Sequence, residues 1–248
     1  MANVQLIEFT GKGRDDEQWH AANLLMFTKA TRLNMSADLF AEIQAKPINE
    51  KLDELEYISR TVPSSWEFVD VTFLISGVTR ATAQQITRTR TASYAMQAQR
   101  VVDVRDIGVM NPFDEEMDAS NYKMFQCAAN TVMDMYAGFL DGGMAAQDAR
   151  GILPMNVRTN LVAKYNLRAL TDLLKSRASM RVQGEYASIA AQMKDAVLET
   201  WPWVNPFLQH PLDKSIQILE EIAERIGVEY DNKIGWDLSK AIDTLRKV

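Results

Sequence analysis

The order of apolar and polar positions predicts short strands and amphipathic helices that alternate through the first half of the chain. Residues 3–10 (NVQLIEFT) and residues 67–76 (EFVDVTFLIS) are rich in β-branched and aromatic side chains, which favour strands. Acidic residues open the segment that begins at Asp15, where the dipole of a helix favours negative charge. Helices are predicted at residues 15–30, 36–44, 48–60 and 79–88.

The second half of the chain has mainly helical periodicity. From Ser120, which can cap a helix N-terminus, apolar residues recur near helical spacing until a pair of glycines, and we expect this helix to lie in the core. Residues 98–104 and 155–166 predict two more strands, and residues 167–201 predict one or two helices. The fold class expected is therefore α+β, without an evident linker.

Composition and charge narrow the class of protein. The 248 residues are 47% hydrophobic and 24% charged, with a formal net charge of −6, which is typical of a soluble globular chain. The chain lacks both a basic start followed by an apolar run and a stretch of about 18 apolar residues, so we expect a cytoplasmic protein without membrane association. The mild acidity argues against a surface that coats nucleic acid. A lone cysteine, Cys127, and two distant histidines leave no internal disulfide and a poor zinc set.

The stretch RTRTASYAMQAQR, residues 88–100, concentrates arginines in this acidic chain. Each arginine alone is most simply a solvated charge at a helix end. Together with the threonines and with Gln97 and Gln99, they supply many hydrogen-bond donors, and guanidinium binds phosphate two bonds at a time. The pattern therefore indicates a nucleotide or another phosphorylated ligand. A second basic group follows at Arg168, Lys175, Arg177 and Arg181.

The arginine stretch resembles the R-H-R-x-x-S loop, with a downstream S-x-R, of the flavin-dependent thymidylate synthases. Arg88, Arg90, Ser93 and Arg100 fall on this motif. Upstream, SSWEFVDVTF is similar to the family's S-x-x-E-H-x-x-x-T-F strand, and TRATAQQITR is similar to the helix that leads into the loop. Downstream, ARGILP, YNLRAL and RASMRVQGE resemble three further family segments in the family's order.

The resemblance implies an α+β fold with a mixed sheet and packed helices, in a single domain over residues 1–248. It also implies homotetramers whose sites form between subunits and hold FAD, a pyrimidine deoxynucleotide and methylenetetrahydrofolate. Arg177 is expected to stabilise negative charge on the pyrimidine and so to be catalytic. The positions expected along the FAD are Arg88, Thr89, Arg90, Asn166, Arg168, Asp172 and Arg181. The positions expected at the nucleotide are Gln85, Gln97, Gln99, Arg100, Arg150 and Arg177, with Arg100 and Arg150 at its phosphate.

Several positions depart from the family pattern. Phe68 replaces the histidine of E-H near the reactive part of the flavin, and Thr89 replaces the histidine of R-H-R. Ala98 replaces a serine beside the nucleotide, and Asp172 replaces an asparagine or histidine near the flavin ring. The scaffold and the phosphate-binding arginines are kept, while the polar groups around the reacting atoms differ.

These departures leave the reaction open. The family reaction passes the methylene of the folate to C5 of dUMP, and reduced flavin, regenerated by NADPH, supplies a hydride that completes the methyl group. Without hydride transfer, water would capture the methylene, and dUMP or dCMP would become a 5-hydroxymethyl nucleotide. Alternatives of other classes are a catalytically inactive relative that binds nucleotide and a nucleic-acid-binding module. Because the whole domain is not basic, the last of these is disfavoured.

Overall fold

The chain divides into two compact units, each built from separate segments of sequence. The computed structural model describes residues 2–177, 184–209, 219 and 241. The first unit comprises Met1–Glu8 and Val71–Tyr165, and the second comprises Phe9–Asp70 and Asn166–Val248. Because the chain passes from one unit to the other inside strands, no linker in the sequence marks the division.

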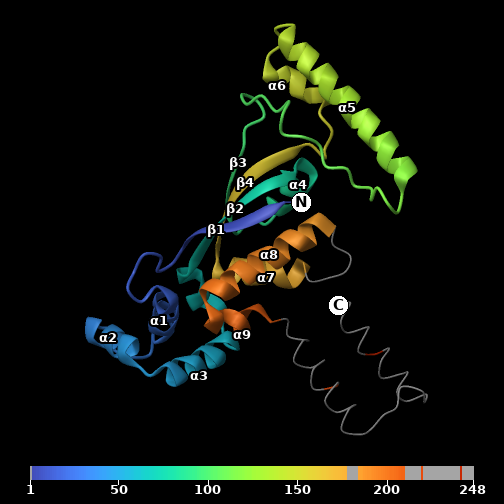
Figure 1. The fold of residues 1–248 in the computed structure, drawn as a ribbon. Helices are drawn as coiled ribbons and strands as arrows, with labels where there is room; N and C mark the ends of the chain where they lie inside the picture. Colours follow the sequence, from blue (N-terminus) through green and yellow to red (C-terminus); the bar gives the residue numbers. More distant parts are fainter. Residues whose placement is uncertain (1, 178–183, 210–218, 220–240, 242–248) are drawn as a thin grey trace, which may run out of the picture. The chain divides into compact units, whose positions relative to one another are not determined.

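A four-stranded sheet has the order β1-β2-β4-β3 (Figure 1). Its strands are β1 (Asn3–Phe9), β2 (Asp70–Thr79), β3 (Ser93–Met96) and β4 (Arg158–Asn166). The inward-facing positions of β2 and β4 are buried alternately, as expected for strands with one face in a core. The strands predicted at residues 3–10, 67–76 and 155–166 are confirmed, with shifted ends.

The sheet is antiparallel and not mixed as expected. Strand β3 pairs with β4 from Ser93 opposite Lys164 to Met96 opposite Leu161. The amide of Thr10, just after β1, donates to the carbonyl oxygen of Asp70 at the start of β2. The amide of Leu167, just after β4, donates to the carbonyl oxygen of Val69, just before β2. Each contact joins the end of one strand to the start of its neighbour, which requires opposite directions.

The strand expected at residues 98–104 does not form, and β3 lies five residues earlier. The ladder with β4 ends when the amide of Gln97 donates to the carbonyl oxygen of Asn160, close to the first residue of β4. Beyond that point the amides of Val101 and Val102 both donate to the carbonyl oxygen of Ala98 and form a turn. The β-branched residues at 101–104 thus have strand propensity but no remaining partner strand.

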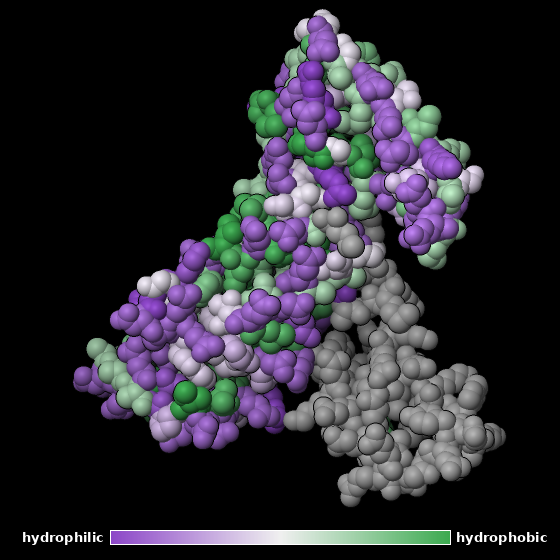
Figure 2. Space-filling view, viewed as in Figure 1, coloured by the Kyte–Doolittle hydropathy of each residue, from purple (hydrophilic) through white to green (hydrophobic). Residues whose placement is uncertain are grey.

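The helices of the first unit are α4 (Arg80–Ile86), α5 (Ala119–Asp141) and α6 (Ala146–Ala149), followed by a 3-10 turn, η2 (Arg150–Ile152). The helix predicted from Ser120 is confirmed as α5, but its expected place in the core is wrong. Only Ala129 and Tyr136 of α5 are buried. Figure 1 shows α5 and α6 together beyond the end of the sheet, and Figure 2 shows apolar and polar residues interspersed over this region.

The second unit is helical. Its elements are α1 (Glu17–Lys29), α2 (Ala37–Ala45), α3 (Ile48–Ser59), the 3-10 helix η1 (Pro63–Phe68), α7 (Leu167–Arg177), α8 (Gly184–Thr200), the 3-10 turn η3 (Pro202–Val204) and α9 (Asn205–Leu208). The helices predicted in these regions are confirmed. Aromatic pairs form its core: Trp66 packs edge-on against Phe207 with centroids 5.0 Å apart, and Phe9 packs likewise against Trp201 at 5.7 Å. No helix of the described residues is long and apolar enough to cross a membrane.

Candidate functional site

The first part of the arginine-rich stretch forms a loop between α4 and β3 that carries Arg88 and Arg90, as predicted. The rest was also expected as a loop but forms β3 and the turn that carries Arg100. The helix unwinds through turn hydrogen bonds, in which the amide of Arg88 donates to the Gln85 carbonyl oxygen and the amide of Thr89 donates to that of Ile86. Arg88 and Arg90 are both exposed beyond this turn. The last residue of α4, Ile86, is buried in the core and anchors the end of the helix. The guanidinium groups of the loop that follows are exposed to solvent.

Tyr94, at the start of β3, fastens this loop. Its hydroxyl lies 3.0 Å from the carbonyl oxygen of Ile86, 3.0 Å from that of Thr89 and 3.3 Å from the hydroxyl of Tyr165. The ring of Tyr94 packs edge-on against the buried ring of Tyr165, with centroids 6.0 Å apart. The backbone on both sides of Arg88 is thus tied to the sheet through one side chain, a role that the sequence analysis missed.

The arginines of this loop and of the turn after β3 carry charge that no described acidic residue neutralises. Among the described residues, no carboxylate or carbonyl oxygen accepts a hydrogen bond from the side chain of Arg88, Arg90 or Arg100, and none of the three belongs to an ion pair. A group of free guanidiniums on a fastened loop is suited to an anionic ligand.

Arg100 lies on the exposed turn that replaces the expected strand, and its neighbour Gln99 is buried. The Nε2 of Gln99 is enclosed and has no hydrogen-bond partner in the described part of the chain. The side chain of Gln97, in contrast, has a hydrogen-bond partner, because its Oε1 accepts from Nδ2 of Asn160 at 3.2 Å. A buried amide donor without a partner is costly unless a ligand accepts from it.

Asn160 links the loop to a bulge in β2 and is a further residue that sequence reasoning missed. Gly77 has a φ of 69°, which a side chain would strain, and its backbone leaves the regular ladder. Its amide donates to Oδ1 of Asn160 at 3.0 Å, and its carbonyl oxygen accepts from Nη1 of Arg158 at 2.8 Å. The side chain of Asn160 therefore positions Gln97 and Gly77 together.

Two more expected nucleotide residues, Gln85 and Arg150, lie in the same unit and are half-buried. The first amides of α4 donate to the carbonyl oxygens of Val157 and Met155, so the helix that carries Gln85 is joined to the chain that follows Arg150. The Nε of Arg150 donates to the carbonyl oxygen of Gln147 at 3.2 Å. Its two terminal nitrogens remain available for a ligand.

The expected flavin residues divide between the units. In the second unit, Oδ1 of Asn166 accepts from the amide of Ala169 at 2.8 Å and caps the N-terminus of α7. Arg168 forms an ion pair with Glu67 of η1 at 2.6 Å. Asp172 is exposed one turn further along the same face of α7.

Arg177, the expected catalytic residue, ends α7 against α8. Its guanidinium carbon lies 4.5 Å from the centroid of the buried Tyr186 ring. The Nε of Arg177 is enclosed and has no hydrogen-bond partner among the described residues. Contact with an aromatic face restrains the guanidinium and leaves some of its N–H donors for an acceptor. Arg181 lies outside the described residues.

Phe68 lies at the edge of a largely apolar cavity of about 550 Å³ in the second unit. The cavity is lined by Leu24, Phe27, Thr28, Thr31, Met35, Ser64, Ser65 and Phe68. The Phe68 ring is 58% exposed although its neighbours Trp66 and Val69 are buried. An exposed ring of this kind offers a flat surface to a planar ligand but no hydrogen bond.

The expected site residues are thus gathered in two groups. The first unit holds Gln85, Arg88, Thr89, Arg90, Gln97, Gln99, Arg100 and Arg150. The second unit holds Asn166, Arg168, Asp172 and Arg177. No cluster of three or more histidine, cysteine or acidic residues in the described ranges is suited to a metal ion.

Comparison with known proteins agrees with the motifs. The family model described as thymidylate synthase complementing protein matches residues 5–203. The chain is 30% identical over 158 residues to the flavin-dependent thymidylate synthase of Geobacter sulfurreducens, covering 63% of this chain and 67% of that protein. It is 27% identical over 201 residues to the enzyme of the same name from Pyrococcus abyssi, covering 79% of both chains.

A solved structure also shares the fold. The crystal structure of a UMP/dUMP methylase PolB from Streptomyces cacaoi bound with 5-Br dUMP superposes with a TM-score of 0.65 at 20% identity. The match covers 84% of this chain and 94% of that one. Because the family model spans most of the chain, the resemblance seen in the motifs is confirmed, and the protein belongs to the family of thymidylate synthase complementing proteins.

Proposed function

We propose that this protein transfers a one-carbon unit from methylenetetrahydrofolate to C5 of a pyrimidine deoxynucleoside monophosphate, with dUMP as the family's usual substrate. The observation that carries the proposal is the set of exposed, unpaired arginines on the loop that Tyr94 fastens. The relatives named flavin-dependent thymidylate synthase support the reaction class. The acidic remainder of the protein is compatible with a local anion site, because the positive field is confined to one loop.

The nucleotide would lie against the first unit. Arg100 and Arg150 would bind its phosphate, since each has free guanidinium donors. Gln85, Gln97 and Gln99 would contact the sugar or the base. The enclosed, unpaired Nε2 of Gln99 favours this role, because a base carbonyl oxygen would satisfy it.

The residues also fit FAD. Arg88 and Arg90 have unpaired guanidiniums that suit its phosphates, and Thr89 adds a hydroxyl between them. Arg168 and Asp172, in the second unit, are the further positions that the family pattern assigns to FAD. When bound, FAD would supply the hydride that turns the transferred methylene into a methyl group, with NADPH as the reductant.

Arg177 would assist the chemistry at the pyrimidine. As C5 becomes nucleophilic, negative charge develops on a ring oxygen, and a fixed guanidinium stabilises that charge without reorganising. The position of the Arg177 guanidinium over the Tyr186 ring supports this role, because the contact restrains the side chain. The N–H of its enclosed Nε would donate to the ring oxygen on which the negative charge develops.

A hydroxymethyl product is the second candidate, favoured by the surroundings of Phe68. The ring is exposed beside an apolar cavity and cannot donate the hydrogen bond that the family histidine provides. Asp172 adds negative charge where a reduced flavin would itself be anionic. Both features disfavour hydride transfer and would leave water to capture the methylene on dUMP or dCMP.

A closed homo-oligomer, a tetramer by family pattern, would complete the site. The two groups of ligand residues lie in different units, and family members combine such segments from neighbouring subunits. The exposed apolar side chains Met124 and Met135 on α5 are consistent with burial in an assembly. Location in the cytoplasm and the absence of nucleic-acid partners remain part of this proposal.

Product analysis tests the proposal. The protein is incubated with dUMP or dCMP and methylenetetrahydrofolate, with and without FAD and NADPH, and the nucleotide is weighed by mass spectrometry. A methyl product that requires NADPH would establish the synthase, and a hydroxymethyl product formed without NADPH would establish the alternative. Failure to form either product, with no release of tritium from C5-labelled nucleotide, would identify an inactive nucleotide-binding relative.

A further inference from the structure

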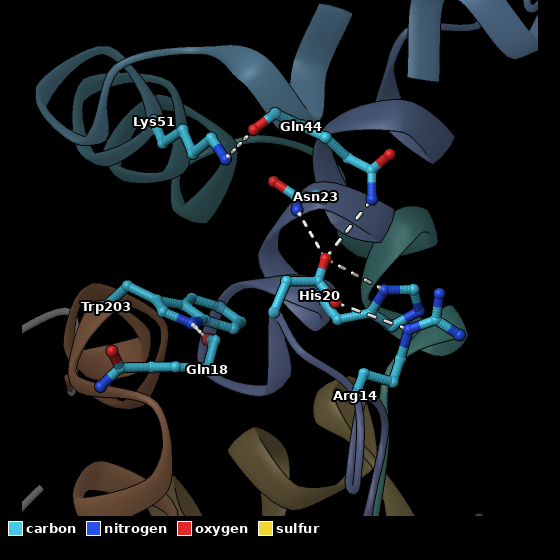
Figure 3. Close-up of polar contacts among 8 residues, drawn as sticks. Arg14, Gln18, His20, Asn23, Gln44, Lys51 and Trp203 are labelled. Carbon is cyan, nitrogen blue, oxygen red and sulfur yellow. Dashed lines mark hydrogen bonds and ion pairs between the residues drawn. The ribbon is translucent and has the colours of Figure 1, made fainter. Parts of the chain in front are cut away.

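A polar cavity of about 630 Å³ lies in the second unit, where the start of α1 faces α2 and α3. Arg14, Asp16, Trp19, Asn23, Gln44 and Lys51 are among the residues that line it. Figure 3 shows four of these, namely Arg14, Asn23, Gln44 and Lys51. None of the residues assigned above to nucleotide, folate or flavin lines this cavity. Its contents therefore need a separate explanation.

Asn23 carries an unsatisfied acceptor at this cavity. The residue is 1% exposed, and its Nδ2 donates to Oδ2 of Asp16 at 3.4 Å. Its Oδ1 is enclosed and has no hydrogen-bond partner in the described part of the chain. Figure 3 shows Asn23 between the pair formed by Lys51 and Gln44 and the side chain of His20. A buried amide oxygen is rarely left unpaired, so a ligand with a donor suits this position.

Lys51 supplies complementary donors. It is 5% exposed, and its Nζ donates to the carbonyl oxygen of Gln44 at 2.9 Å while lying 5.8 Å from the centre of the Trp19 ring. An ammonium has three hydrogens, so donors remain beyond the bond to Gln44. Burial lowers the pKa of Lys51, opposed by the attraction of Asp16.

Charge in the cavity is balanced. Arg14 pairs with Asp16, with Nε and Oδ1 3.5 Å apart. Asp15 is exposed and has no ion pair or hydrogen bond to its side chain within the described ranges. The lining thus holds two acidic residues, Asp15 and Asp16, and two basic residues, Arg14 and Lys51. Either sign of charge on a ligand would thus meet repulsion as well as attraction, which favours a neutral ligand.

We propose that this cavity binds a small neutral polyhydroxyl compound through a sugar ring, either a free sugar or the sugar of an uncharged nucleoside. A hydroxyl both donates and accepts, so the hydroxyls of such a compound can donate to Oδ1 of Asn23 and accept from Lys51. Asp15 and Asp16 accept from further hydroxyls, and the Trp19 ring packs against the apolar face of a sugar. One water would satisfy Asn23 but would occupy only a small part of the volume.

Ligand-observed saturation-transfer NMR of the full chain tests the proposal with glucose, ribose and uridine as probes. Glucose 6-phosphate serves as a charged comparison. We expect saturable binding of at least one neutral probe below about 50 mM and weaker binding of the phosphate. Ribose and glucose without uridine would indicate a free sugar, whereas uridine alone would indicate a nucleoside.

Variants locate the binding. Asp15→Ala removes an exposed acceptor that has no structural partner, and Trp19→Ala removes the packing surface, so each should weaken binding about fivefold or more. Asp53→Ala, an exposed acid on α3 that does not line the cavity, should leave it unchanged. Saturable binding of no neutral probe, or binding unaffected by Asp15→Ala in a folded variant, would overturn the proposal. Uridine can also occupy the nucleotide site proposed above, so only binding that Asp15→Ala or Trp19→Ala weakens is assigned to this cavity, and the outcomes for glucose and ribose do not depend on that function.

Discussion

The hydroxyl of Tyr94 lies 3.0 Å from the carbonyl oxygen of Thr89, across the base of the loop that carries the candidate phosphate ligands. The same hydroxyl reaches the carbonyl oxygen of Ile86, at the last residue of α4. The single hydroxyl hydrogen of Tyr94 can be donated to only one of these carbonyl oxygens at a time. It can switch between them when the loop moves slightly, and both carbonyl groups stay close to the sheet. The loop is thereby organised before any ligand arrives, which lowers the cost of binding.

Tyr94→Phe should weaken FAD binding, because the loop that it loosens carries Arg88 and Arg90, without unfolding the protein. The ring still packs against Tyr165, but the loop loses its hydrogen bond, which we expect to raise the dissociation constant about fivefold. Calorimetric titration measures this change. Tyr57→Phe, at an exposed tyrosine on α3, is the matched control. Equal affinity of Tyr94→Phe and the wild type would show that the loop does not need this contact.

Arg100→Ala and Arg150→Ala should each lose affinity for the nucleotide phosphate. A charge-assisted bond is removed, and the expected loss is about 1.5–3 kcal/mol in the binding free energy for dUMP and dCMP. Arg32→Ala, at an exposed arginine of the second unit without a partner in the described residues, controls for overall charge. If both nucleotides bound the two variants as tightly as the control, the phosphate assignment would be wrong.

The sequence revealed the arginine-rich loop but not the long-range contacts that position the candidate ligand residues. The arginines from Arg88 to Arg100 are visible as a local run, whereas the ion pair of Arg168 with Glu67 joins positions 101 residues apart. The strand expected at 98–104 failed because β4 starts at Arg158, and strand length depends on a distant partner as well as propensity. The exposure of α5 could not be foreseen either, since helical periodicity identifies an apolar face but not what covers it.

Asp16→Asn should destabilise the second unit in a pH-dependent way. Burial raises the pKa of Asp16, but the attraction of His20 and the hydrogen bond from Gln44 more than offset it, so the pKa lies below its usual 3.8. A lowered carboxyl pKa stabilises the fold above pH 3.8, and this stabilisation is lost as the pH falls below that value.

Urea unfolding of Asp16→Asn and wild type measures the difference. We expect the variant to lose about 1–2 kcal/mol of unfolding free energy at neutral pH, because charge-assisted contacts to Asn23 and Gln44 are weakened. The difference should narrow as the pH is lowered below 3.8. Asp15→Asn, at an exposed carboxylate, is the control. A difference that is constant with pH would mean that the charge of Asp16 contributes nothing.

The exposed face of α5 should be buried in the oligomer. Met124 and Met135 lie three helical turns apart on one side, and both are at least half exposed. Introducing glutamate at both positions places charges in an apolar interface, so light scattering should show smaller particles at the same concentration. Asn130→Glu, on a different side of α5, should keep the wild-type mass. A wild-type protein that is monomeric would already contradict the assembly proposed above.

The ring of Phe68 should pack against the flavin, but it cannot donate a hydrogen bond to it. The ring is 58% exposed at the cavity edge, so Phe68→Ala removes an aromatic face without opening the core, and FAD should bind about fivefold more weakly or worse. Phe68→His keeps a planar ring and restores a donor, so it should retain FAD and raise the share of methyl over hydroxymethyl product.

Val62→Ala, at an exposed position next to η1, controls for changes in the fold. Flavin absorbance after gel filtration reports binding, and mass spectrometry reports the product ratio. If Phe68→Ala bound FAD as tightly as the wild type, the Phe68 ring would not be part of the flavin site. If Phe68→His left the product ratio unchanged, residue 68 would not decide whether hydride or water reacts with the methylene.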